Sequence, residues 1–312
     1  MYINRVLVSA PPMLCMLDKF VDFANELDIE LIPAKVTQTL TELELVQLLP
    51  EFDGWIIGDD PATERVFKSG RRGKLKAAVK WGIGVDNIDF NSCNELKIPI
   101  TNTPGMFGNE VADIALGYLI GLSRNIVQID RNIREGQWIK PQGISLMGKK
   151  VALLGYGDIG RNTAKRLNCL GMKVIVYDPH ITQNDIEDGS TLLTWPLDIG
   201  QADFLIITCS LNTQTLHLIN DKIFSIMKKG IRIINVSRGP IIKEEHLIKA
   251  LDNRIVHSVA LDVFEKEPLP INSKIRDYED CILGSHNASN TEEAVTRTSK
   301  KAISILSEFL KN

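Results

Sequence analysis

The chain has 312 residues, of which 44% are hydrophobic and 24% are charged, and its formal net charge at pH 7 is -3. This composition is typical of a globular protein and excludes a disordered or fibrous one, while the length predicts about two domains. Because the chain has no general excess of positive charge, we expect it to bind neither nucleic acid nor an anionic membrane surface.

The cysteines and the apolar segments predict a cytoplasmic protein. The five cysteines are spread along the chain without a C-x-x-C pair, which argues against a disulfide framework and against a zinc site. The first residues lack the long apolar segment of a signal peptide. The most apolar helical segment, residues 111–122, is too short to cross a bilayer. We therefore expect a reducing compartment, no membrane span and no metal site.

Short apolar segments alternate with helical patterns, which is typical of parallel sheets in an α/β fold. In the first part of the chain the predicted strands are residues 5–9, 54–58, 77–80 and 99–102. Apolar residues at spacings of three and four then predict an amphipathic helix, for which Asn109 is the expected N-cap. The polar segment 131–148, which contains Trp138, is interpreted as an arm or linker.

A second series of strands follows that linker. The predicted strands are residues 151–154, 173–177, 204–208, 232–236, 258–261 and 281–284. Helical segments separate most of them, and a last amphipathic helix follows residue 289. This pattern predicts a second parallel sheet.

The first strand of this second series leads into the motif G-Y-G-D-I-G and then into a helix. In that context the motif indicates a dinucleotide site. The first glycine allows the tight turn, the second lets a pyrophosphate approach the backbone, and the third lets the helix pack on the strand. The N–H groups and positive dipole end of the helix attract phosphate. The predicted cofactor-binding residues here are Gly155, Gly157, Asp158, Ile159 and Gly160.

Asp178 ends the next predicted strand, 18 residues after Gly160, close to the ~20 that separate the motif from a ribose-binding acid. A carboxylate at this place accepts hydrogen bonds from the ribose hydroxyls and repels a 2′-phosphate. No arginine or lysine lies between Asp178 and Ser190 to bind such a phosphate. The sequence therefore predicts NAD rather than NADP. The alternative role for Asp178 is to cap the turn before Pro179.

Three residues with acid–base or anion-binding chemistry follow the last three predicted strands. They are Arg238, Glu267 and His286, and in an open α/β sheet ligands bind beyond such carboxyl ends. We expect the Arg238 guanidinium to bind a substrate carboxylate in a fork and to polarise a carbonyl. His286 would exchange a proton with the substrate oxygen, and Glu267 would fix the imidazole tautomer. The other histidines are expected to be surface or core residues.

These motifs, together with residues 82–89 (GIGVDNID), 102–105 (NTPG) and 262–264 (DVF), resemble the D-isomer-specific 2-hydroxyacid dehydrogenases over nearly the whole chain. Within that family the phosphoglycerate dehydrogenase-like branch without a regulatory tail is the most similar. The resemblance implies NAD(P) dependence, the catalytic set Arg238, Glu267 and His286, and a homodimer formed by the cofactor domains. It also implies that Cys209, Ser237 and Asp262 lie along the cofactor.

The resemblance further implies a substrate site in the first domain. The backbone N–H groups of Ile83 and Gly84 would bind the substrate carboxylate, as N–H nests bind anions. Lys80 stands where several phosphoglycerate enzymes carry an arginine near the substrate, and a lysine supplies charge without the fork. The segment 58–61 is acidic where those enzymes often carry a basic residue for the phosphate.

We therefore predict two doubly wound parallel-sheet domains, of Rossmann or flavodoxin-like type, with the active site in a cleft between them. The substrate domain comprises residues 1–101 and 288–312, and the NAD-binding domain residues 102–287. The expected reaction is NAD-linked interconversion of a small D-2-hydroxy acid and its 2-keto acid, with 3-phosphoglycerate first and hydroxypyruvate, glyoxylate or another 2-keto acid second. The alternative of another class is an NADH-sensing, corepressor-like binding protein, because fold does not fix function.

Overall fold

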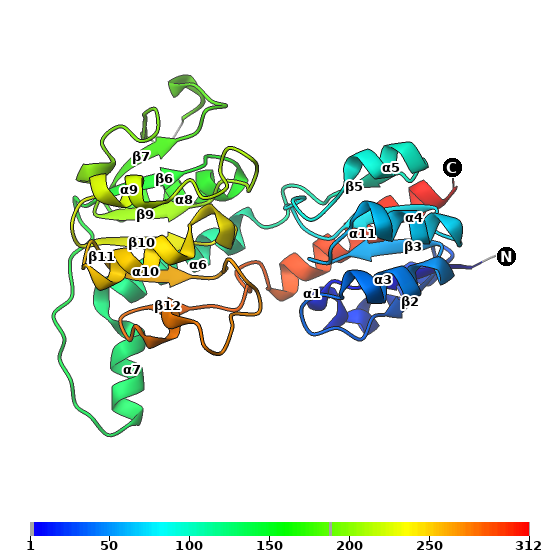
Figure 1. Cartoon of the computed structure of the whole chain (residues 1–312), viewed down its shortest axis with the longest axis horizontal. Coiled ribbons are helices and arrows are strands. Elements are labelled where there is room, and N and C mark those ends of the chain that lie inside the picture. Colours follow the sequence, from blue (N-terminus) through cyan, green and yellow to red (C-terminus); the bar gives the residue numbers. More distant parts are fainter. Residues whose placement is uncertain (1–2, 187–188, 312) are drawn as a thin grey trace. The chain divides into compact units, whose positions relative to one another are not determined.

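The computed structural model describes residues 3–186 and 189–311. The chain divides into two compact units (Figure 1). The first unit runs to Met106 and resumes at Asn290, and the second unit is Phe107–Ser289. The first and last segments of the sequence therefore belong to one unit.

The first unit contains a five-stranded parallel sheet in the order β2-β1-β3-β4-β5. Every residue of the central strands β3 and β4 is buried, as expected for a parallel sheet that is covered on both faces. Strand β2 was missed by the sequence analysis because its residues Ile-Glu-Leu-Ile-Pro form no clear pattern at this edge of the sheet. The strands are β1 Asn4–Val8, β2 Ile29–Pro33, β3 Gly54–Ile57, β4 Ala77–Lys80 and β5 Ile100–Thr101.

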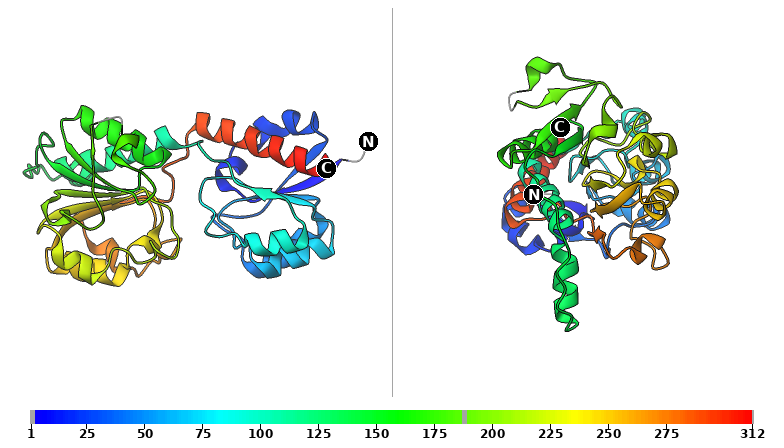
Figure 2. Two further views of the ribbon diagram at one scale, coloured as in Figure 1. Left: turned by 90° about the horizontal axis from the view of Figure 1, so that it is seen from above. Right: turned by 90° about the vertical axis from the view of Figure 1, so that its left-hand side faces the viewer.

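Helices cover both faces of this sheet (Figure 2). One face packs against α1 Pro11–Leu14, α2 Val21–Asn25 and α11 Glu292–Lys311. The other packs against α3 Glu42–Leu48, α4 Glu64–Arg72 and α5 Phe90–Leu96, and short 3-10 helices η1 Leu17–Phe20 and η2 Leu49–Glu51 complete the unit. The indole Nε1 of Trp81 donates to Ser299 Oγ at 3.0 Å, so the last helix is tied to the end of β4.

The second unit contains a seven-stranded parallel sheet in the order β12-β11-β10-β9-β6-β7-β8. The strand order reverses between β6 and β9, and ligands of doubly wound sheets bind at such a switch point. The short edge strand β8 was not expected from the sequence. The strands are β6 Lys150–Leu154, β7 Lys173–Tyr177, β8 Thr191–Leu192, β9 Phe204–Ile207, β10 Ile231–Asn235, β11 Val256–Leu261 and β12 Ile282–Leu283.

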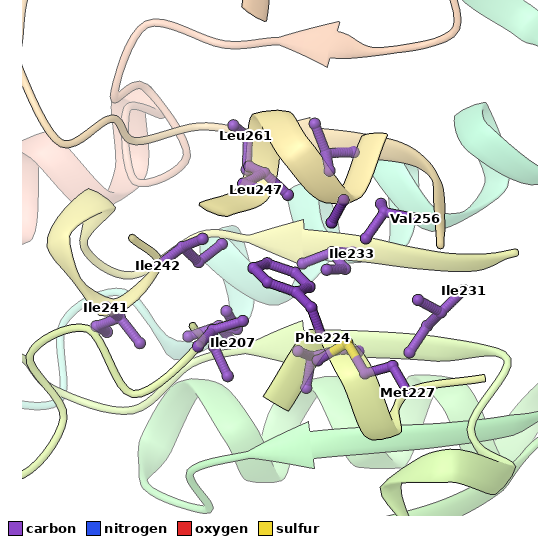
Figure 3. Close-up of a cluster of buried hydrophobic side chains, with 14 of the residues drawn as sticks. Ile207, Phe224, Met227, Ile231, Ile233, Ile241, Ile242, Leu247, Val256 and Leu261 are labelled. Atoms are coloured by element: carbon purple, nitrogen blue, oxygen red, sulfur yellow. The ribbon is translucent and has the colours of Figure 1, made fainter. Parts of the chain in front are cut away.

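The faces of the second sheet are also covered by helices (Figure 2). Helices α6 Gly108–Arg124 and α8 Asp158–Cys169 pack on one face, and α9 Asp221–Ile226 and α10 Glu244–Asp252 pack on the other. Figure 3 shows the core beneath α9 and α10, where Phe224 and Met227 pack among aliphatic side chains of the sheet. Four 3-10 helices complete the unit: η3 Gln183–Asp185, η4 Ile199–Gln201, η5 Gly239–Ile241 and η6 Lys274–Asp277.

Helix α6 differs from the sequence expectation at its start. It begins at Gly108, so Asn109 is a helical residue, and the N-cap is Phe107 without a side-chain hydrogen bond. A Cβ atom at Gly108 would lie 2.2 Å from Asp158 Oδ1. Helix α6 therefore packs closely against the Asp158 side chain at its start, and no side chain caps it.

The segment interpreted as an arm is partly helical. Helix α7 Ile126–Arg134 occupies its first residues and projects from the second unit (Figure 1), while residues 135–149 contain no helix or strand. The Trp138 side chain is 81% exposed. Within the described part of the chain, the helices are all too short or too polar to traverse a bilayer.

Candidate active site

The glycine-rich turn joins β6 to α8 at the switch point of the second sheet. Gly155 has a φ of +97°, and a Cβ atom there would lie 2.6 Å from the backbone nitrogen of Cys209. A Cβ atom at Gly160 would lie 2.2 Å from the carbonyl oxygen of Gly155. At Gly157, in contrast, a Cβ atom would meet no atom within 4 Å. The first and third glycines are thus required by packing, and the second leaves open space at a helix N-terminus, which fits a pyrophosphate.

Asp178 follows β7 and is bound to this turn. Its Oδ2 accepts the N–H of Tyr156 at 2.8 Å, and its Oδ1 accepts the N–H of His180 at 2.9 Å. Asp178 therefore organises the turn before Pro179, which is the alternative role, and it also lies beside the glycine motif, while ribose binding stays a prediction. A carboxylate has further lone pairs to accept from ribose hydroxyls, so the turn and Asp178 fit the adenosine and pyrophosphate part of NAD.

Cys209 and Ser237 lie close together beside the same turn. The Ser237 hydroxyl donates to the carbonyl oxygen of Cys209. Burial raises the pKa of the Cys209 thiol to about 12, so the thiol is protonated at neutral pH and is not a nucleophile. Thr208 Oγ1 donates to the carbonyl oxygen of Gly155 at 3.0 Å. The ends of β9 and β10 are thereby joined to the glycine-rich turn.

The open space at Gly157 gives a testable difference between folding and cofactor binding. Because Gly157 has a φ of -70° and no atom near its Cβ position, we expect Gly157→Ala to leave the free energy of unfolding within about 0.5 kcal/mol of wild type. The added methyl group occupies the space that suits the pyrophosphate, so the Kd for NADH should rise about tenfold or more. Fluorescence titration with NADH and denaturant unfolding measure the two effects.

Gly117→Ala is the matched control for that variant. Gly117 lies on α6, and its Cβ position also has no atom within 4 Å. This substitution should leave NADH binding unchanged. An unchanged Kd in Gly157→Ala would contradict the assignment of the turn.

Arg238 follows β10, which lies beside β11 in the sheet. The side-chain amide of the buried residue Asn235 donates to the Arg238 carbonyl oxygen at 2.9 Å and accepts the Ser237 N–H at 3.1 Å. These bonds fix the backbone from which the guanidinium projects. Arg238 Nη1 donates to the Ser237 carbonyl oxygen at 3.0 Å, and the side chain is partly exposed. A partly exposed guanidinium on a fixed backbone can bind a carboxylate.

Glu267 and His286 are in direct contact. Glu267 Oε2 lies 2.8 Å from His286 Nδ1, and the two side chains are 23% and 22% exposed. Glu267 Oε1 accepts the backbone N–H of Phe264 at 2.9 Å, which orients the carboxylate. Because Glu267 faces Nδ1, the ring nitrogen assigned to proton exchange with a substrate oxygen is Nε2. The structure thus joins a pair that lies 19 residues apart in the sequence.

Three neighbouring strands carry these side chains. Arg238 follows β10, Glu267 follows β11 and His286 follows β12, and the order of these strands in the sheet is β12-β11-β10. All strands are parallel, so their carboxyl ends lie at the edge that also carries the glycine-rich turn after β6. A cofactor that is bound at the turn therefore shares this edge with an arginine and a His–Glu pair.

Asp262 is only 2% exposed. Its Oδ1 accepts the hydroxyl of Tyr118 at 3.0 Å, and its Oδ2 accepts the N–H of Ala288 at 2.9 Å. Both carboxylate oxygens thus accept hydrogen bonds from protein groups. Contact between Asp262 and the cofactor stays a prediction. The contribution of Tyr118 was missed because a tyrosine within an amphipathic helix carries no sequence signal of its own.

The first unit holds the residues expected to bind substrate. Lys80 is 1% exposed, and its Nζ donates to Asp59 Oδ1 at 2.8 Å and to the Gly58 carbonyl oxygen. Lys80 therefore ties the end of β4 to the turn after β3, and Asp59 balances its charge. Ile83 and Gly84 lie in the turn after β4 and are partly exposed. Their binding to substrate stays a prediction.

Residues 71–74 (Arg-Arg-Gly-Lys) form a basic cluster just before β4 begins, at the end of that strand opposite to the Ile83–Gly84 turn. Arg71 and Arg72 end α4, and the N–H of Lys74 donates to the Pro50 carbonyl oxygen at 3.0 Å before β4 begins. These residues therefore lie at the amino edge, whereas Ile83 follows the carboxyl end of β4. The cluster is solvent-exposed, and it does not supply charge to the Ile83–Gly84 turn.

All five cysteines are free thiols. Among the residues that the structure describes, no group of three or more His, Cys, Asp or Glu side chains is arranged to hold a metal ion.

The fold and this site define an α/β protein with a dinucleotide-binding unit. Residues 116–288 match the family model described as "D-isomer specific 2-hydroxyacid dehydrogenase, NAD binding domain". The chain therefore belongs to the D-isomer specific 2-hydroxyacid dehydrogenase family, and its second unit contains the NAD-binding domain of that family.

The proteins that are similar in sequence to this chain have names that refer to different substrates. The chain is 35% identical to "D-3-phosphoglycerate dehydrogenase 3, chloroplastic" of Arabidopsis thaliana over 88% of this chain and 45% of that protein. It is 33% identical to "Hydroxypyruvate reductase" of Thermotoga maritima over 84% of this chain and 86% of that protein. The chain spans less than half the length of the phosphoglycerate dehydrogenases it matches first.

A solved structure shares the fold over almost the whole chain. The TT0316 protein of Thermus thermophilus superposes with a TM-score of 0.85 at 25% identity, covering 98% of this chain and 97% of that one.

Proposed function

We propose that the chain catalyses the NAD-dependent interconversion of a small D-2-hydroxy acid and its 2-keto acid. The observation that carries this proposal is the contact of 2.8 Å between His286 Nδ1 and Glu267 Oε2, at the sheet edge that also carries Arg238 and the glycine-rich turn. A proton-transfer pair and an anion-binding guanidinium beside a dinucleotide turn suit hydride chemistry on a 2-keto acid.

In this proposal, different residues of the second unit bind the cofactor, bind the substrate and transfer the proton. Gly155–Gly160 and Asp178 would hold the cofactor, which accepts or supplies a hydride when it is bound. Arg238 binds the substrate carboxylate and polarises the carbonyl at C2. His286 Nε2 gives a proton to the carbonyl oxygen during reduction and takes one from the hydroxyl during oxidation. Glu267 holds the ring through Nδ1 and stabilises the imidazolium form.

We propose that the backbone N–H groups of Ile83 and Gly84, in the first unit, bind the substrate carboxylate. In this proposal residues 1–101 and 288–312 form the substrate domain and residues 102–287 the cofactor domain. Support comes from the turn after β4, because its residues are partly exposed at the carboxyl edge of the first sheet. Gly84→Pro removes one of these N–H groups. We expect this variant to lose substrate binding and to keep NADH binding.

D-3-phosphoglycerate is the first candidate substrate, in line with the names of several relatives. One observation favours an unphosphorylated acid such as hydroxypyruvate or glyoxylate: Asp59 balances the charge of Lys80. A compensated lysine attracts a phosphate less strongly than an unpaired one. The two candidates differ in substrate and share the same reaction.

An assay with the purified chain tests this function. NADH consumption would be followed with phosphohydroxypyruvate, hydroxypyruvate, glyoxylate and pyruvate, and each acid would be repeated with NADPH. We expect turnover of at least one acid and faster turnover with NADH, because the Asp178 carboxylate repels a 2′-phosphate. Tight NADH binding without turnover of any acid would instead favour the corepressor-like binding protein.

We further propose a cytoplasmic homodimer formed by the cofactor domains. Five free thiols suit a reducing compartment, and Trp138 and Ile126 of the second unit expose 81% and 50% of their surface. We take these exposed apolar side chains as candidate residues of the dimer interface. A monomer in sedimentation equilibrium, or recovery in a membrane or secreted fraction, would contradict this proposal.

A further inference from the structure

The buried carboxylate of Asp262 connects helix α6 to the segment that carries His286. Its Oδ1 accepts the Tyr118 hydroxyl at 3.0 Å, and its Oδ2 accepts the Ala288 N–H at 2.9 Å. The main-chain carbonyl oxygen of Asp262 accepts the His286 N–H at 2.7 Å. One residue therefore binds both ends of the segment 286–288.

This segment needs such support because His286 adopts the left-handed conformation, with a φ of +56°. A residue with a Cβ atom is disfavoured there, and the surrounding structure must hold it. In this backbone conformation the His286 ring nitrogen Nδ1 lies 2.8 Å from Glu267 Oε2. A change in the torsion angles of residue 286 would therefore turn the ring away from Glu267.

Gly284 provides the space in which Tyr118 and Asp262 meet. A Cβ atom at Gly284 would lie 2.3 Å from Asp262 Oδ1 and 2.3 Å from the Tyr118 hydroxyl oxygen. Any side chain at this position would therefore separate the two groups. Burial and the Asp262 charge raise the pKa of the Tyr118 phenol, so Tyr118 stays a donor across the neutral pH range.

We propose that Tyr118 is a positioning residue for the proton-transfer pair. Its hydroxyl orients the Asp262 carboxylate, which holds segment 286–288 and thereby sets the His286 ring against Glu267. Tyr118 contacts neither substrate nor reacting atoms in this assignment. The inference rests on the proposed function, since it assumes that His286 exchanges the proton.

Removing only the hydroxyl group tests the assignment. We expect Tyr118→Phe to lower kcat about tenfold, because small displacements of a reacting group are costly. The KM for the keto acid and the Kd for NADH should stay within about twofold of wild type. Tyr278→Phe is the matched control. The Tyr278 hydroxyl also donates to an aspartate, Asp252 Oδ1, at 2.7 Å, but Asp252 does not hold segment 286–288. This control should leave kcat unchanged, and an equal loss in both variants would overturn the proposal.

A double-mutant cycle tests whether Tyr118 acts through Asp262. Groups that act through one another give non-additive effects. In an Asp262→Asn background, Tyr118→Phe should therefore change kcat by less than about twofold further. Full additivity of the two losses would overturn the proposal.

Amide hydrogen exchange gives a readout that does not depend on turnover. The Ala288 N–H should exchange about tenfold faster in Tyr118→Phe than in wild type or Tyr278→Phe, because its acceptor, the Asp262 carboxylate, loses its orientation. Unchanged exchange, or faster exchange with an unchanged kcat, would overturn the proposal. If the wild type turns over none of the acids, the proposed function fails, and the exchange rates alone decide whether Tyr118 holds the segment.

Discussion

We expect His286→Ala to lower kcat by about 10²–10⁴-fold, the usual contribution of general acid–base catalysis. The substitution removes the imidazole after β12 to which the proposed function assigns proton exchange with the substrate oxygen. The Kd for NADH should stay within about twofold of wild type, because the glycine-rich turn and Asp178 form their contacts without His286. Steady-state kinetics on the best 2-keto acid and NADH titration measure the two quantities.

His246→Ala is the control for this variant. His246 is also a half-buried histidine of the second unit beside a carboxylate, with its Nε2 at 3.2 Å from Asp221 Oδ2, and it lies on α10. Its removal should leave kcat unchanged. A fully active His286→Ala variant would show that another group or water supplies the proton, and the role assigned to the Glu267–His286 pair would then be wrong.

We expect Arg238→Lys to lower kcat/KM by about 10–100-fold. Lysine keeps the positive charge but cannot form two parallel hydrogen bonds to a carboxylate, and each lost bond to a charged group is worth about 1.5–3 kcal/mol. The effect should appear in the KM for the keto acid and in kcat, because the guanidinium both binds the carboxylate and polarises the carbonyl. NADH binding should be retained.

Arg166→Lys is the control for this second variant. Arg166 Nε donates to Asp113 Oδ1 at 2.8 Å, and its side chain is 25% exposed, but it joins α8 to α6 and not to the catalytic edge. It should retain full kcat/KM. If Arg238→Lys retained it as well, the fork between guanidinium and substrate carboxylate would be excluded.

The strands of both sheets were predicted well where they are buried. Strand β7 matches the expected residues 173–177, and β4 matches residues 77–80. Buried parallel strands are continuous apolar segments, so their signal lies within a few neighbouring residues. The edge strands β2 and β8 were missed, since one contains Glu30 and the other is two residues long. Their pairing with a neighbouring strand, not their composition, defines them.

In the candidate site, too, features with a local sequence signal could be predicted, and contacts between distant residues could not. The glycine-rich turn could be predicted because its function depends on backbone geometry that three spaced glycines permit locally. Arg238, Glu267 and His286 could be predicted as a group from the rule that parallel strands end at one edge and from the family resemblance. The hydrogen bond between Glu267 and His286, the pairing of Lys80 with Asp59 and the connection of Tyr118 to Asp262 could not be predicted, because their partners lie 19, 21 and 144 residues apart.

Length and composition by themselves determined that this is a globular protein of about two domains, and local patterns determined its α/β class and its dinucleotide turn. The tertiary structure decided where the units divide, because the last helix packs on β3 and β4 of the first sheet. It also decided how deeply the charged side chains are buried. Asp59 neutralises Lys80 inside the first unit, while Arg238 remains partly exposed at the edge of the second. Burial and pairing determine how strongly a charge acts on a ligand, and both depend on residues that meet only in the folded chain.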